Sequence, residues 1–151
     1  KKKNKLLDNV NFVQDNESES FRGVLRGLQF QKPPYTQAKL VRCLKGSVLD
    51  VVLDLRKDSK TYSKFETILL SEENKKQLFI PKGFAHGFVV LSDAATFTYK
   101  VDCLYAPKYE RGIAFDDKDL QINWQLNSDI LKLSNKDRNN PRISNAIDLF
   151  D

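Results

Sequence analysis

The chain has 151 residues, of which 40% are hydrophobic and 30% are charged, and its formal net charge is +5. That length suits one domain with a single hydrophobic core and leaves no room for a second. The composition excludes a disordered chain, and no apolar run reaches the roughly 18–20 residues of a transmembrane helix, so we expect no membrane partner.

The chain begins with a basic segment, in which Lys1, Lys2, Lys3 and Lys5 supply four of the five net charges. We expect a solvated end rather than a nucleic-acid arm, because no aromatic residues are interleaved with these lysines. The segment lacks the apolar stretch of a signal peptide, which predicts a cytoplasmic protein. No methionine is present, even at position 1, so we expect the sequence to be a piece of a longer product.

Residues 23–31 form the first predicted strand region and place two carboxamides, Gln29 and Gln31, on one face of the strand. Pro33 and Pro34 then fix an extended or turning link. From residue 38 onward, turn residues separate short runs rich in Val, Leu, Phe and Tyr. These runs are 39–44, 48–55, 64–70, 77–80, 87–91 and 95–101. Their spacing predicts a mostly β sandwich or barrel.

Turn and helix signals complete the predicted fold. The sequence Lys45-Gly46-Ser47 suits a tight hairpin. Helix is scarce, since only residues 71–74 carry the signal of one short capped turn and only residues 143–150 predict a short terminal helix.

Alternation along the strands places two polar side chains among apolar neighbours. Lys39 shares a face with Val41 and Cys43, and Tyr99 shares a face with Phe97. A buried ammonium or phenol group needs a partner or a ligand, so both residues are candidates for a binding site. A core tyrosine bonded to the backbone is an equally good reading of Tyr99.

Two cysteines, Cys43 and Cys103, lie sixty positions apart, outside any CxxC motif or Cys/His cluster. This spacing predicts buried thiols in a reducing compartment rather than a metal site.

Seven positions resemble the skeleton of the two cupin motifs: Gln29, Gln31, Lys39, Gly46, Pro81, Gly83 and His86. In metal-binding cupins, a His pair, an acidic residue and a later His hold the ion inside a small barrel. Here two glutamines replace the His pair and a lysine replaces the acid, which leaves one imidazole. We therefore expect no metal and no other cofactor.

A closer resemblance runs through seven motifs in chain order, at residues 12–18, 23–28, 37–42, 54–56, 80–88, 99–100 and 133–137. Together they resemble the dTDP-4-dehydrorhamnose 3,5-epimerase family. The resemblance implies that residues 1–151 form a single cupin-type jelly-roll domain that lacks the family's N-terminal strands. It also implies a homodimer that acts without metal on a nucleotide-linked 4-keto-6-deoxy sugar, in deoxysugar and polysaccharide biosynthesis.

The chemistry that this resemblance implies is proton abstraction next to the C4 ketone, followed by return of a proton to the opposite face. By resemblance, Lys39 stabilises the enolate, Tyr99 donates the proton and Asp137 orients the base. The residues that match substrate contacts are Gln14, Asp15, Asn16, Arg26, His86, Glu110 and Lys136. Among them, Arg26 matches a diphosphate contact, and His86 matches a second donor to the C4 oxygen.

One position departs from the family pattern, because Gln29 stands where the resemblance places the catalytic base His. A carboxamide has no useful basicity near neutral pH. Four explanations stay open: an engineered substitution that traps substrate, a natural loss that leaves a binding-only protein, a sequence error, or a variant that uses another base. The alternatives to an epimerase are a silent cupin that binds a nucleotide sugar and a purely structural β-sandwich module.

Overall fold

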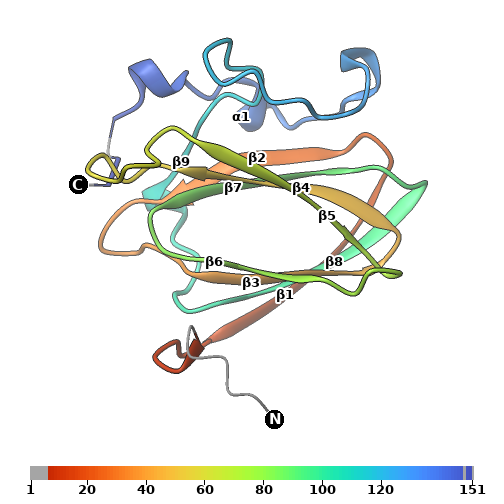
Figure 1. Ribbon diagram of the computed structural model, residues 1–151, viewed down its shortest axis with the longest axis horizontal. Coiled ribbons are helices and arrows are strands. Elements are labelled where there is room, and N and C mark those ends of the chain that lie inside the picture. Colours follow the sequence, from red (N-terminus) through yellow and green to blue (C-terminus); the bar gives the residue numbers. More distant parts are fainter. Residues whose placement is uncertain (1–6, 148, 151) are drawn as a thin grey trace.

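The computed structural model describes residues 7–147, 149 and 150, and two antiparallel sheets dominate this range. The strands are β1 (Gln14–Phe21), β2 (Leu25–Gln31), β3 (Lys39–Lys45), β4 (Ser47–Asp54), β5 (Phe65–Ser71), β6 (Gln77–Ile80), β7 (Phe84–Val90), β8 (Ala94–Val101) and β9 (Glu110–Gly112). One sheet has the order β1-β8-β3-β6 and the other has the order β5-β4-β7-β2-β9 (Figure 1). They face each other as the two layers of a sandwich, which confirms the mostly β prediction.

All six runs predicted after residue 38 are strands, and most of their bounds agree within one residue. The largest difference is at β7, which begins at Phe84 rather than at residue 87. The sequence indicated no strand at β1, which follows a polar sequence and pairs along its whole length with β8.

The link at Gly46 is not a hairpin, so this prediction is wrong. Strand β3 pairs with β6 and β8, whereas β4 pairs with β5 and β7. The chain therefore crosses from one sheet to the other at Gly46, whose φ of 75° lies in the left-handed region that favours glycine. A short turn signal does not distinguish such a crossing from a hairpin, because it indicates a change of chain direction and not which strands pair.

The predicted terminal helix at 143–150 is also wrong. The described part of this segment holds a single 3₁₀ turn, η4 (Ile143–Asn145), and Phe150 forms a bridge with Arg56; residue 148 lies outside the described residues. Ile143 and Leu149 are both buried against the same apolar core. An irregular path allows both side chains to reach this core. At residues 71–74 the chain makes one turn but no helix.

Two apolar cores hold the fold together. One fills part of the space between the sheets and includes Val41, Val48, Phe88 and Phe97. The other lies on the opposite face of the five-stranded sheet, which the C-terminal segment (blue in Figure 1) covers with residues such as Trp124. Because the inner core occupies only part of the interior, polar side chains occupy the rest.

Both cysteines are free, and only Cys43 is fully buried, while Cys103 is partly exposed. No helix among the described residues is long and apolar enough to cross a membrane.

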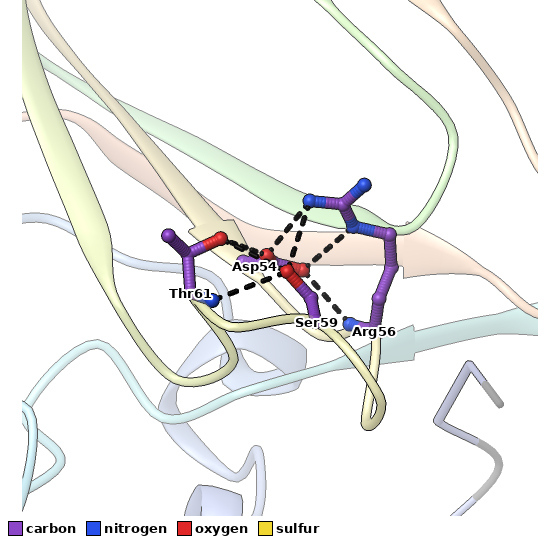
Figure 2. A network of polar contacts seen from close by, with 4 residues as sticks. All are labelled: Asp54, Arg56, Ser59 and Thr61. Atoms are coloured by element: carbon purple, nitrogen blue, oxygen red, sulfur yellow. Dashed lines mark hydrogen bonds and ion pairs between the residues drawn. The ribbon is translucent and has the colours of Figure 1, made fainter.

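A polar network closes the turn after β4 (Figure 2). Asp54, which is 1% exposed, accepts hydrogen bonds from Arg56 Nε at 3.0 Å, Arg56 Nη2 at 2.9 Å and Thr61 Oγ1 at 2.6 Å. Burial alone would raise the pKa of the Asp54 carboxyl, but these hydrogen bonds outweigh burial and hold that pKa well below its usual range. The ionised carboxylate is therefore the form that stabilises this turn.

We expect Asp54→Asn to lower the free energy of unfolding by about 1–3 kcal/mol at pH 7, because it removes a buried, charge-assisted network. A lowered carboxyl pKa contributes stability above the ordinary pKa near 4, and this contribution is lost as pH falls through the lowered value. The difference between the two proteins should therefore narrow below about pH 4. Denaturant unfolding of both proteins, at pH 7 and at a pH below the ordinary carboxyl pKa, measures this difference in stability. Asp58→Asn, on the exposed part of the same turn, is the control.

Candidate active site

The polar end of the barrel interior contains two adjoining cavities of about 670 and 340 Å³. They share Asn16, Arg26, Gln29, Lys39 and Tyr99 among their lining residues. Every one of the eleven site residues predicted from the sequence lines one or both of them. The larger cavity adds Asp15, His86 and Asp137, and the smaller adds Gln14, Glu110 and Lys136. These volumes lie within the range of small-molecule sites.

Gln29 belongs to strand β2, and its side chain contacts the C-terminal segment. Helix α1 (Asn135–Arg138) begins after Ser134, whose hydroxyl caps the helix by accepting a hydrogen bond from Asp137 N at 3.1 Å. This short helix brings the buried Asp137 against β2, where Gln29 Nε2 donates to Asp137 Oδ1 at 3.0 Å. The carboxylate therefore faces the position that the family pattern gives to the base, and here its partner is an amide.

Gln29 and His86 face each other across the pair of strands β2 and β7. The register of this pair shifts between Arg26 and Gln29, where Gly27 has a φ of 105°. A Cβ atom on Gly27 would lie 2.5 Å from the carbonyl oxygen of His86, so only glycine allows this approach. The glycine thus helps to hold the carboxamide and the imidazole side by side on the cavity wall.

His86 forms a buried pair with Asp50 from the neighbouring strand β4. The distance between His86 Nε2 and Asp50 Oδ1 is 2.7 Å, and the two residues are 7% and 0% exposed. Because a carboxylate only accepts hydrogen bonds, Nε2 carries the proton and Nδ1 is the nitrogen left for a ligand. Asp50 Oδ2 is buried without a hydrogen-bond partner among the described residues.

Lys39 and Tyr99 line the cavities from the opposite sheet. The Lys39 ammonium lies 5.8 Å from the centre of the Tyr99 ring. Burial lowers the pKa of Lys39 to about 8, although the charges of Asp50 and Glu110 act in the opposite direction. Burial also raises the pKa of Tyr99, opposed by the charge of Arg26. At neutral pH the cavity thus holds a cation beside a protonated phenol.

Glu110 organises the mouth of the smaller cavity. Tyr105 OH donates to its Oε2 at 2.5 Å, and the Lys136 ammonium bonds to the same oxygen. The hydrogen bond to this carboxylate raises the pKa of Tyr105 to about 12. Asp15 lies at the rim of the larger cavity, and its carboxylate pairs with Lys100 at 2.7 Å on the exposed side of β1. Asp15 is thus an exposed member of the predicted site, with 74% of its side chain accessible.

Sequence reasoning missed Asp50, the buried partner of His86. Its signal is a carboxylate with apolar residues on both sides inside the run 48–55, where a buried acid requires a partner. It also missed Ser134, which caps α1 and lines the larger cavity.

A cation, a phenol and an imidazole–carboxylate pair around one cavity provide what the deprotonation of a carbon next to a ketone requires. No group of three or more His, Cys, Asp or Glu side chains that could hold a metal ion occurs in the described part of the chain. This double-sheet barrel, with a polar site at one end of its interior, has the architecture of the cupin class of proteins.

Comparisons with known proteins identify the family within that class. The family model described as dTDP-4-dehydrorhamnose 3,5-epimerase matches residues 1–145. The dTDP-4-dehydrorhamnose 3,5-epimerase of Shigella flexneri is 52% identical over 91% of this chain and 75% of its own length. That of Methanothermobacter thermautotrophicus is 53% identical over 86% of this chain and 70% of its own length.

A solved structure gives the same result. The dTDP-6-deoxy-D-glucose-3,5-epimerase from Legionella pneumophila, in complex with dTDP-4-keto-L-rhamnose, superposes with a TM-score of 0.90 at 44% identity. The match covers 94% of this chain and 76% of that one. The chain therefore belongs to the dTDP-4-dehydrorhamnose 3,5-epimerase family, and the resemblance and the cupin-type fold are both confirmed.

Proposed function

We propose that this protein is an isomerase that epimerises a dTDP-linked 4-keto-6-deoxy sugar by removing a proton next to the C4 ketone. Family membership at about half identity over most of the chain supports the substrate class and the reaction. The inactive-binder alternative has no comparable support, since the relatives that match are described as epimerases.

The observation that carries the proposal is the pair formed by Lys39 and Tyr99 within one cavity. In the proposed mechanism, the C4 ketone lies beside the Lys39 ammonium, which stabilises negative charge on the oxygen as the enolate forms. Tyr99, kept protonated by its raised pKa, then returns a proton to the carbon. Gln29 takes no proton, so the base is a separate question.

Deuterium incorporation from D₂O at C3 and C5 of a dTDP-linked 4-keto-6-deoxyhexose tests this function. We expect exchange of at least one of these hydrogens with the unmodified chain, together with saturable binding of dTDP. Binding without exchange would instead support the silent-cupin alternative. Absence of both would favour a structural module.

Arg26 is proposed to bind the diphosphate, because it lines both cavities. A guanidinium can donate two parallel hydrogen bonds to the oxygens of one phosphate. We expect Arg26→Ala to weaken dTDP binding by roughly 10–100-fold, the value of about 1.5–3 kcal/mol for hydrogen bonds to a charged group. Calorimetric titration with dTDP measures the loss. Arg42→Ala, on an exposed position of β3 outside both cavities, is the matched control and should bind normally.

The proposal includes a single-domain homodimer in the cytoplasm. Strand β1 supports the dimer, because it spans eight residues at the edge of its sheet and pairs only with β8 among the described strands. Long edge strands are surfaces on which further strands pair. The two free cysteines are consistent with a reducing compartment. Light scattering on the protein as it elutes from a size-exclusion column measures its molar mass and tests the dimer.

A further inference from the structure

The mechanism proposed above needs a base, and the described cavity walls hold one imidazole, that of His86. Gln29 and Lys39 do not serve: the amide is not basic, and the lysine is protonated below its pKa of about 8. Asp137 is buried and accepts a hydrogen bond from Gln29, which leaves the carboxylate behind the amide. The imidazole of His86 supplies a ring nitrogen that can accept a proton, so it is the group that we assign as the base.

The contacts of His86 are those of a general base rather than of a core histidine. Its Nε2 donates to the fully buried Asp50, so in the neutral imidazole Nδ1 is the unprotonated nitrogen. Nδ1 makes no hydrogen bond within the described residues, and the ring lines the larger cavity. Phe97 packs against the ring with centroids 6.1 Å apart and restricts its rotation. The ring thus lines the ligand space and keeps one nitrogen without a hydrogen-bond partner among the described residues.

The location of His86 explains how the site works without a histidine at position 29. Gln29 and His86 are cross-strand partners, and directly opposed Cβ atoms in an antiparallel pair lie about 4.5–5.5 Å apart. Asp50 on β4 is opposite Phe88 on β7, and Phe88 lies two residues beyond His86 along that strand. The three side chains thus form a row across β2, β7 and β4. The imidazole–carboxylate pair in this row is His86 with Asp50. Its imidazole lies one strand away from position 29, where the family pattern has the base.

We propose that His86 is the catalytic base of this protein and that Asp50 is its positioning residue. This inference rests on the proposed function. His86 Nδ1 takes the proton from the carbon next to the ketone, and the electron pair of the broken C–H bond forms the carbon–carbon double bond of an enolate at Lys39. The Tyr99 hydroxyl protonates the carbon from the other side. The phenolate then regains a proton from water, and the imidazolium releases its proton to water.

The first variant that tests this role is His86→Gln, whose amide keeps a donor for Asp50. Deuterium exchange is measured on the dTDP-linked 4-keto-6-deoxyhexose, with dTDP affinity as the check on folding and binding. We expect exchange to fall by roughly 10²–10⁴-fold while dTDP affinity is retained. Exchange at the unmodified rate in His86→Gln overturns the inference and leaves the proposed function intact. A complete lack of exchange in the unmodified chain overturns both.

The second variant separates a base from a donor to the C4 oxygen. The double variant Gln29→His with His86→Gln places the imidazole one strand away, next to Asp137. If His86 is the base, the relocated imidazole restores exchange well above the level of His86→Gln. If His86 acts on the C4 oxygen instead, the double variant stays as slow as His86→Gln although Gln29→His alone is active. That result overturns the assignment.

Asp50→Asn tests the positioning role by separating the rate of exchange from binding. Among the described residues, Asp50 is the group that hydrogen-bonds to the His86 ring and holds its orientation. Its loss should therefore lower the rate of deuterium exchange at saturating substrate while dTDP affinity is retained. An exchange rate equal to that of the parent in Asp50→Asn contradicts the role.

Discussion

Replacing Lys39 by methionine is expected to reduce deuterium exchange at the carbons next to the ketone by roughly 10²–10³-fold, the usual effect of removing one oxyanion stabiliser. The ammonium is the cation placed beside the proposed enolate, and methionine has a similar length without charge. Affinity for dTDP should stay close to that of the parent, since the nucleotide lies away from the ketone. A loss of binding equal to the loss of exchange would contradict the position given to Lys39.

The same variant should unfold no more easily than the parent. Burial lowers the pKa of Lys39 to about 8, so at pH 7 the folded protein keeps an ammonium in surroundings that disfavour the charge. Because the unfolded chain binds this proton more tightly, stability from this group increases as pH rises above 8. Methionine removes the unfavourable charge. A stable variant with lost exchange is the pattern of a catalytic residue rather than a structural one.

Lys39 also gives the pH profile a testable alkaline limb. Exchange in the parent should decline as pH rises through about 8, because the enolate loses its cation. In Lys39→Arg the guanidinium stays charged throughout this range, so the decline should move to higher pH even if the maximum rate is lower. An identical alkaline limb in both proteins would show that another group titrates there.

The strands around the inner core could be predicted from the sequence, because their apolar residues alternate or run together. Strand β1 could not. Its inward positions, which include Gln14, Asn16 and Ser18, face the cavities and are polar, so the strand lacks an apolar side. A binding site thus removes the signal that predicts a strand. The helix prediction for residues 143–150 failed for the opposite reason. The apolar residues of this segment fit a helix pattern, but they pack onto the sheet along an irregular path.

The residues of the candidate site could be predicted through resemblance, whereas their partners could not. Alternation along the strands singled out Lys39 and Tyr99, and the resemblance added His86; the structure brings all three to one cavity. Asp50 depends on the register between β4 and β7, which places it diagonally from His86 and which no local pattern encodes. The assignment of a base therefore required the fold, because it depends on a contact between residues 36 positions apart.

Restoring the family residue by Gln29→His should increase deuterium exchange above the parent rate, by less than the roughly 10²–10⁴-fold that a positioned general base adds to a site without one, because His86 already serves the parent. The partner is already in place, since Asp137 Oδ1 lies 3.0 Å from the donor atom of Gln29 and the carboxylate is buried. An imidazole at this position can donate one N–H to Asp137 and turn its other nitrogen to the substrate. Proton exchange on the dTDP-linked ketosugar measures the gain.

Gln29→Asn is the matched control, because it changes the same side chain without adding a base, and it should show no gain. Asp137→Asn should cancel the gain in Gln29→His and have little effect in the parent, where no imidazole depends on it. Equal rates in Gln29→His and the parent would mean that the cavity does not present the substrate carbon to position 29. In that case His86, one strand away, would be the better placed of the two groups.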